Sequence, residues 1–140
     1  MTTPPASGHP VAVTAALGSH NYRVELRARG FRFTADEPPD LGGGDTAPTP
    51  GELLAGALAS CTAVTVRMYA DRKGWPLAGV FVAVRYVEGG AERRMQCAVR
   101  VDGNLDAEQR ARLVEIAGRC PVHRLLEAGV EVDTVADGDA

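Results

Sequence analysis

The chain has 140 residues, of which 45% are hydrophobic and 24% are charged, and this balance is typical of one soluble globular domain with its own core. A net charge of −3 argues against binding to nucleic acid or to an anionic membrane through overall charge. Three cysteines are too few for a secreted disulfide scaffold. The first residues, "MTTPPASGHP", show no basic region followed by an apolar run. We therefore expect a cytoplasmic protein whose thiols are reduced.

We expect one domain over 1–140, with loose ends at 1–10 and 136–140. The alternating stretches "PVAVTAALG" and "NYRVELRARGFRFTADE" predict two or three antiparallel strands, with turns at 18–21 and at Gly30. Residues 38–50 are rich in proline and glycine. They predict a long loop, and a loop of this length usually borders a functional site or a partner.

A helix with clear end signals follows the loop. Thr49 suits the N-cap, Pro50 the first helical position, and Glu52 the third, which together form a capping box. The helix should run to about Lys73 and end at Gly74. Helical spacing relates Leu54, Leu58, Cys61, Thr65 and Met68. The first half is apolar on every side, which predicts burial all round. Its charge-free run of about 14 residues is too short to span a bilayer.

The second half of the chain predicts strands and then helices. "GVFVAVRYVEGGAERRMQCAVRVDG" reads as two long strands joined at 89–90. An amphipathic helix should begin after an N-cap at Asp106 and weaken at Gly118. Its inward-facing residues should be Leu113, Ile116 and Ala117.

A short third helix should begin at Pro121, with Cys120 as its N-cap. "VEVDTV" then predicts a final strand. Strands, a helix, strands, helices and a strand, in that order, indicate an α+β domain rather than a doubly wound parallel sheet.

The cysteines differ in what their positions allow. A thiolate at Cys120 would be stabilised by free backbone N–H groups, although the residue could also serve only as a cap. Cys61 lies inside a helix, where burial would make it inert unless a cation approaches, so its position alone favours packing. Cys97 lies on a strand and is interpreted as structural. The spacings contain no C-x-x-C pair, so no metal site and no cofactor are expected.

Glu52 also has two interpretations. The capping box accounts for it fully. A catalytic role would require it to reach Cys61, which lies nine residues further on, or about 13 Å of helical rise. Nucleotide-binding, serine-hydrolase and metalloprotease motifs are absent from the sequence.

Three stretches together resemble the OsmC/Ohr family of hydroperoxide reductases, in particular its OsmC-like branch. They are "ADEPPDLGGGDTAPTP", "TPGELLAGALASCTAVTVRMYADRKGWPL" and "RCPVHRLLEAGVEV". The resemblance extends from about Arg23 to Val135. It implies an α+β fold with antiparallel sheets around two central helices. It also implies an intertwined homodimer with active sites at the subunit interface.

The resemblance further implies the chemistry of a thiol-dependent peroxidase. Cys61 would be the peroxidatic thiolate that attacks an organic hydroperoxide and becomes a sulfenic acid. Cys120 would then form a disulfide with it, and an external dithiol, such as a lipoylated protein, would reduce that disulfide.

Family members also hold the peroxidatic thiolate with an arginine from an N-terminal strand, and here Arg27 and Arg29 are the candidates. A helix-start glutamate pairs with that arginine. The family position falls on Gly51 here, and Glu52 is one residue, or about 100° of helix, away from it. This shift leaves open an alternative to catalysis, namely a non-catalytic or redox-sensing dimer associated with stress.

Overall fold

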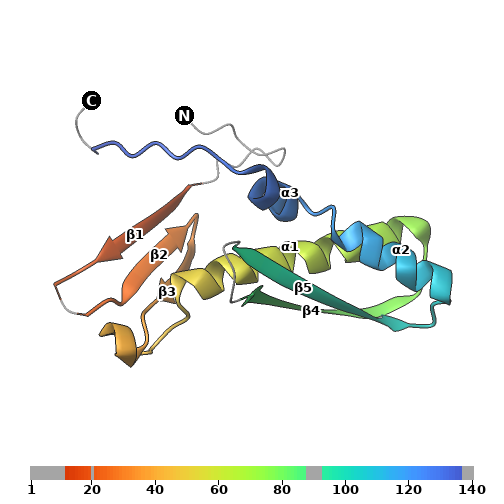
Figure 1. The fold of residues 1–140 in the computed structure, drawn as a ribbon, viewed down its shortest axis with the longest axis horizontal. Coiled ribbons are helices and arrows are strands. Elements are labelled where there is room, and N and C mark those ends of the chain that lie inside the picture. Colours follow the sequence, from red (N-terminus) through yellow and green to blue (C-terminus); the bar gives the residue numbers. More distant parts are fainter. Residues whose placement is uncertain (1–11, 20, 88–92, 137–140) are drawn as a thin grey trace. The chain divides into compact units, whose positions relative to one another are not determined.

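The computed structural model describes residues 12–19, 21–87 and 93–136. The elements in chain order are β1 (Val13–Leu17), β2 (Val24–Ala28), β3 (Phe31–Ala35), η1 (Pro39–Leu41), α1 (Pro50–Lys73), β4 (Leu77–Val87), β5 (Arg94–Gly103), α2 (Ala107–Ala117) and α3 (Pro121–Ala128) (Figure 1). Contacts divide the chain into two compact units, Met1–Leu54 and Ala55–Ala140. The mixture of helices and antiparallel sheets confirms the α+β class. That 1–140 acts as a single domain stays a prediction.

The first unit contains an antiparallel sheet with the order β1-β2-β3. Leu17 pairs with Val24 across the first connection, and Ala28 pairs with Phe31 across the second. Among the described residues this sheet therefore has three strands, and the tight turn falls at Gly30 as predicted. The predicted loop follows β3, and its only regular piece within the described residues is the one-turn 3-10 helix η1.

Helix α1 begins and ends where the sequence predicts. The Thr49 hydroxyl accepts a hydrogen bond from the Glu52 N–H (3.1 Å), and the Glu52 carboxylate accepts one from the Thr49 N–H (2.9 Å). This reciprocal pair is the capping box. At the other end Gly74 has φ +68°, a left-handed conformation that glycine adopts without strain and that ends the helix.

The prediction that the first half of α1 is buried all round is wrong for the single chain. The buried residues form one stripe at four-residue spacing: Leu58, Thr62, Val66 and Ala70. Two residues of the predicted apolar series, Leu54 and Met68, are 45% and 58% exposed. The helix carries apolar residues on all sides, but the rest of the chain packs against only one side of it. The residues of α1 outside this stripe are half-buried or exposed in the single chain.

The apolar character of α1 also bears on the membrane. Its 24 residues have a mean hydropathy of 1.4 over the most apolar window, enough by length and composition to cross a bilayer. The core helix of a soluble protein passes the same test.

Arg72 and Lys73 lie in the last turn of α1, where their charge complements the helix dipole.

In the second unit, α1 and α2 run alongside the hairpin of β4 and β5 (Figure 1). The two strands pair antiparallel, with Val84 opposite Cys97; the predicted turn at 89–90 lies outside the described residues. A core cluster joins the helices and strands, and its buried members are Val66, Ala70, Leu77, Val101, Leu105, Leu113 and Ala117.

Helix α2 has the predicted cap and inward face. Asp106 and Gln109 form a capping box, and Leu113, Ile116 and Ala117 are buried. Arg110 fixes the connection from β5 by donating to three backbone carbonyls, those of Val101 (2.7 Å), Gly103 (2.8 Å) and Leu105 (3.2 Å).

The predicted strand over "VEVDTV" is wrong. Residues 129–136 follow α3 without strand pairing, and Val130, Val132 and Val135 are 67%, 80% and 83% exposed. A strand exists only when a neighbour accepts its backbone hydrogen bonds. The alternating sequence satisfies the side-chain pattern, but this chain alone does not pair its backbone.

Candidate functional site

The two cysteines predicted to be redox-active lie together in the second unit. Cys61 is half-buried on α1, and Cys120 is fully buried at the start of α3. The Cys120 thiol is close enough to act on the pKa of Cys61, and both thiols are free rather than joined in a disulfide. The sequence predicted each position but could not show that they meet.

The start of α3 brings backbone N–H groups to both sulfurs. Cys120 has the extended conformation of an N-cap (φ −68°, ψ 150°) and Pro121 starts the helix. The Cys120 sulfur accepts a hydrogen bond from the His123 N–H at 3.2 Å, while the Cys61 sulfur accepts one from the Val122 N–H. Donors without a helical partner and the positive end of the dipole therefore face both sulfurs.

The environment of Cys61 opposes ionisation on balance. Burial raises the pKa of the Cys61 thiol, and the hydrogen bond and charge of Cys120 raise it further. The Val122 N–H and the Thr65 hydroxyl lower this pKa, without cancelling the rise. Because the thiolate is the nucleophile, Cys61 needs a positive charge from elsewhere to react quickly at neutral pH.

Thr62 and Cys97 also belong to this site, and the sequence analysis missed both. The Thr62 hydroxyl lies 3.6 Å from the Cys120 sulfur and 3.9 Å from the Cys97 sulfur. Cys97 is on β5 and has the same half-buried side as its neighbours Met95 and Val99. The alternation of β5 could have placed Cys97 on the core side of the strand. No sequence signal indicated that Cys97 and Cys120 contact the same hydroxyl.

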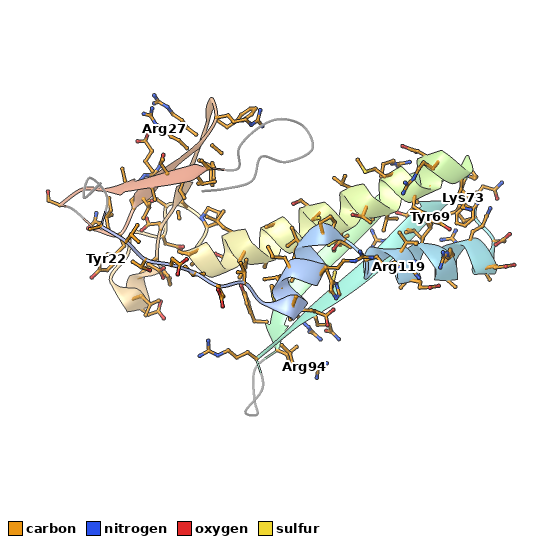
Figure 2. All side chains as sticks on the ribbon, turned by 90° about the horizontal axis from the view of Figure 1, so that it is seen from above. Tyr22, Arg27, Tyr69, Lys73, Arg94 and Arg119 are labelled. Carbon is orange, nitrogen blue, oxygen red and sulfur yellow. The ribbon has the colours of Figure 1, made fainter. Side chains whose placement is uncertain are left out.

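The candidate arginines lie in the first unit. Arg27 is on β2, where it forms an ion pair with Glu25 at 3.3 Å and keeps 53% of its side chain exposed; its side chain projects away from the sheet (Figure 2). Arg29 was expected on the same strand, and that is wrong, because β2 ends at Ala28. Arg29 is in the turn with φ 56°, and its guanidinium lies 4.8 Å from the Phe31 ring centroid. That either arginine holds Cys61 stays a prediction.

Glu52 is fully used in the capping box described above. This confirms the local interpretation of the residue. A catalytic role for Glu52 stays a prediction.

A buried carboxylate in the first unit was also missed. Asp36 is 1% exposed and accepts hydrogen bonds from the N–H groups of Glu37 (2.8 Å) and Thr46 (3.0 Å) and from the Thr46 hydroxyl. These bonds, the Thr46 hydroxyl first, lower the pKa of Asp36 from 3.8 to about 2. Arg23 in turn donates to the Thr46 hydroxyl and carbonyl, so the long loop is organised around one charge.

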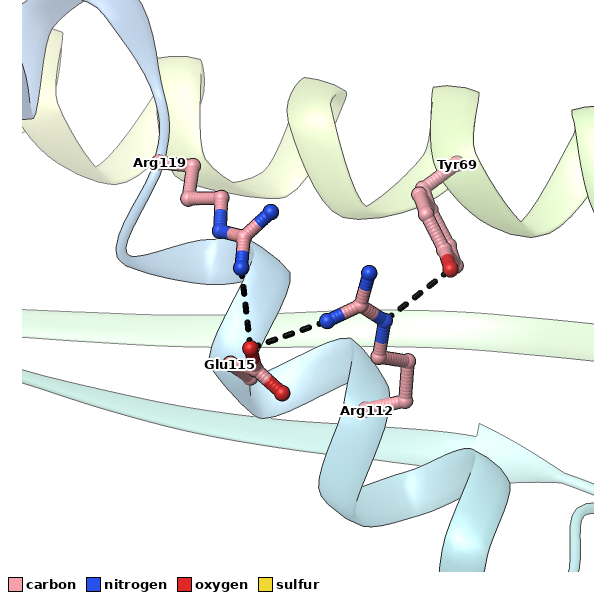
Figure 3. Close-up of polar contacts among 4 residues, drawn as sticks. All are labelled: Tyr69, Arg112, Glu115 and Arg119. Carbon is pink, nitrogen blue, oxygen red and sulfur yellow. Dashed lines mark hydrogen bonds and ion pairs between the residues drawn. The ribbon is translucent and has the colours of Figure 1, made fainter.

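A second polar cluster connects α1 and α2. Arg112 donates from Nε to the Tyr69 hydroxyl (3.0 Å) and from Nη1 to Glu115 (2.9 Å), which also accepts from Arg119 (2.9 Å) (Figure 3). The Arg112 hydrogen bond lowers the pKa of Tyr69. The Lys73 ammonium lies 5.6 Å from the Tyr69 ring centroid, at the same end of α1 (Figure 2). This cluster stabilises the contact between the two helices.

Metal binding has no support in the part of the chain that the structure describes. Across residues 12–19, 21–87 and 93–136, His, Cys, Asp and Glu side chains form no group of three that could hold a metal ion.

The fold and this site define an α+β protein whose long helix carries a cysteine against a second cysteine at the start of a short helix. The OsmC-like protein family model matches residues 42–135, and the chain belongs to this family. The match includes both cysteines and confirms the resemblance seen in the sequence. No curated protein sequence matches this chain.

Solved structures share the fold. An OsmC-like protein from Mycoplasma pneumoniae is 18% identical, with a TM-score of 0.70 over 84% of this chain and 86% of that one. The organic hydroperoxide resistance protein OsmC from Legionella pneumophila is 22% identical, with a TM-score of 0.61 over 84% and 89%. The organic hydroperoxide resistance protein OhrB of Bacillus subtilis is 20% identical, with a TM-score of 0.61 over 86% and 93%. At these identities the likeness establishes the fold.

Proposed function

We propose that this protein is a thiol-dependent peroxidase that reduces organic hydroperoxides to alcohols. The observation that carries the proposal is the proximity of the Cys61 and Cys120 thiols at the start of α3. Membership of the OsmC-like family supports it, as do structural relatives named organic hydroperoxide resistance proteins.

The reaction needs two thiols in succession. The Cys61 thiolate attacks the terminal oxygen of the hydroperoxide, the O–O bond breaks, and the departing alkoxide takes a proton to become the alcohol. Cys61 is then a sulfenic acid. The Cys120 sulfur attacks the Cys61 sulfur, an S–S bond forms, the S–O bond breaks, and the hydroxide leaves with a proton as water. An external dithiol, such as a lipoylated protein, reduces the disulfide by exchange.

Activation of Cys61 is the demanding part of the proposal. Because burial raises the pKa of this thiol, a cation must offset it, and we assign that role to Arg27 or Arg29, with Glu52 as the carboxylate near the helix start. We also place the active protein in the cytoplasm as a homodimer, where a reducing environment keeps all three thiols free between turnovers.

Peroxide consumption by the purified protein tests this function. With dithiothreitol as reductant, cumene hydroperoxide should be consumed at a rate that Cys61→Ser abolishes. Cys120→Ser should leave sulfenic acid at Cys61 unresolved. Ser60→Ala is the matched control, because Ser60 is an exposed neighbour on α1 whose hydroxyl donates only locally, to the Ala57 carbonyl. Unchanged consumption without Cys61 would sink the assignment.

A redox-sensing role without turnover is the second candidate. It is favoured by the raised pKa of Cys61, since a slow thiol suits a switch that is oxidised once and stays oxidised. Repeated cycling with a dithiol supports the peroxidase. One equivalent of peroxide consumed, followed by a lasting disulfide, supports the sensor.

A further inference from the structure

A single hydroxyl lies between the sulfurs of Cys120 and Cys97. Thr62 Oγ1 is 3.6 Å from the Cys120 sulfur, and the Cys97 thiol donates to the same oxygen at 3.9 Å. The three residues come from α1, β5 and the start of α3. Thr62 and Cys120 are both 0% exposed, so bulk solvent does not reach this contact.

The position of Thr62 does not require a hydroxyl for packing. It lies in the buried stripe of α1, where the following turns carry Val66 and Ala70. A buried hydroxyl is costly unless it is hydrogen-bonded. The chain therefore places a polar group where an apolar one would pack, and that group contacts the sulfur that must attack Cys61.

The direction of the contacts decides what the hydroxyl can do. A threonine hydroxyl has one hydrogen to donate and two lone pairs to accept. Because the Cys97 S–H donates to Oγ1, the Thr62 hydrogen stays available for Cys120. Once Cys120 has lost its proton, its sulfur has no hydrogen to donate and can only accept, from the Thr62 hydroxyl and from the His123 N–H, so two donors then face the attacking sulfur.

We propose that Thr62 is a catalytic residue of the disulfide-closing step and that Cys97 is a positioning residue, which acts by directing the Thr62 hydroxyl toward Cys120. This inference rests on the proposed peroxidase function and concerns its second chemical step. In that step Cys120 loses its proton, its sulfur attacks the Cys61 sulfenic acid, the S–S bond forms and the S–O bond breaks. The hydroxide leaves and takes up the proton as water. Thr62 keeps its own proton throughout and stabilises the attacking sulfur.

Single-turnover kinetics separates this step from peroxide attack. Each protein receives one equivalent of cumene hydroperoxide without reductant. Mass spectrometry then follows the dimedone-trapped sulfenic acid at Cys61 and the Cys61–Cys120 disulfide. Two variants test the hydroxyl: Thr62→Val removes it at nearly constant shape, and Thr62→Ser keeps it. Two more test the donor to that hydroxyl: Cys97→Ala removes the donor, and Cys97→Ser replaces the thiol with a hydroxyl that can also donate.

The proposal predicts a split between the two steps. Thr62→Val should form sulfenic acid at close to the parent rate but close the disulfide at least about tenfold more slowly, the size expected for one hydrogen bond to a charged group. Thr62→Ser should restore most of the rate. Cys97→Ala should slow closure by about threefold, as expected for a weaker, indirect bond, and Cys97→Ser should not.

The outcomes separate this inference from the proposed function. The absence of both sulfenic acid and a disulfide at Cys61 in the parent protein would defeat the peroxidase itself. Sulfenic acid that closes equally fast in parent and Thr62→Val would overturn only the role of Thr62, and equal slowing in Thr62→Val and Thr62→Ser would show a packing effect instead. If far-ultraviolet circular dichroism shows that Thr62→Val does not fold, the Cys97 pair decides: slower closure in Cys97→Ala than in Cys97→Ser supports the proposal, and equal rates overturn it.

Discussion

At Cys61, opposite influences meet on one sulfur atom. Burial raises the pKa of the thiol, while the Val122 N–H and the Thr65 hydroxyl lower it. Among the groups of the second unit, those that raise the pKa of Cys61 outweigh those that lower it. A raised pKa leaves most of the sulfur protonated at neutral pH, so the rate of any thiolate reaction rises with pH until the pKa is passed.

The first prediction concerns the cation that would offset burial. We expect Arg27→Ala or Arg29→Ala to raise the pKa of Cys61 relative to the parent protein, because the thiolate loses a positive neighbour. The measurement is the pH dependence of Cys61 alkylation by iodoacetamide, quantified by peptide mass spectrometry. At neutral pH the affected variant should react about tenfold more slowly for each unit of upward shift.

Arg100→Ala is the matched control for that experiment. Arg100 is an exposed arginine of β5 whose partner is Asp102 at 3.8 Å, so its loss should leave the alkylation profile of Cys61 unchanged. If neither Arg27→Ala nor Arg29→Ala moves the profile, the arginine clamp is wrong and the redox-sensing role gains support.

At the scale of elements, the long loop after β3 depends on Asp36. The Asp36 N–H also donates to the Pro48 carbonyl (3.0 Å), and the Asp45 N–H donates to the Glu37 carbonyl (3.0 Å). Gly43 has to approach so closely that a Cβ atom there would lie 1.9 Å from the Glu37 carbonyl oxygen. The loop therefore has a defined conformation that specific hydrogen bonds hold. Its proline- and glycine-rich composition predicted only that it is a loop.

The second prediction follows from the low pKa of Asp36. A carboxyl group whose pKa is lowered on folding stabilises the fold when ionised, so its contribution is complete above pH 3.8 and is lost as pH falls toward 2. Asp36→Asn should remove that pH dependence and increase the hydrogen exchange rate of the Thr46 amide at neutral pH. Asp40→Asn, at an exposed carboxylate of the same loop, should do neither, and equal exchange in both variants would contradict the role of Asp36.

The sequence predicted elements where the signal is local. The capping box at Thr49 and the N-caps at Asp106 and Cys120 each involve residues within one helical turn, and all three are confirmed. The strand over "VEVDTV" was wrong because pairing depends on a distant or separate neighbour. Cys97 was not recognised for the same reason: its contact with Thr62 joins residues 35 positions apart, and no spacing rule connects them.

At the scale of the whole molecule, a single chain leaves much apolar surface uncovered. In the second unit Val64 and Met68 are 52% and 58% exposed on successive turns of α1. Large exposed side chains also lie on the other elements of this unit: Phe81, Val114 and Leu125. Large apolar side chains that are exposed in a single chain often mark an interface with another chain, which agrees with the proposed homodimer.

The third prediction tests that homodimer. Met68 is already exposed in one chain, so Met68→Glu should cost an isolated monomer little. In a dimer that covers α1, the same carboxylate would be buried without a partner and would oppose association. We therefore expect the parent protein to sediment as a dimer and Met68→Glu to shift toward the monomer in analytical ultracentrifugation, with unchanged far-ultraviolet circular dichroism. Arg72→Glu, a charge reversal at an exposed polar position of the same helix, should remain dimeric. A Met68→Glu protein that stays fully dimeric would show that the interface does not include this side of α1.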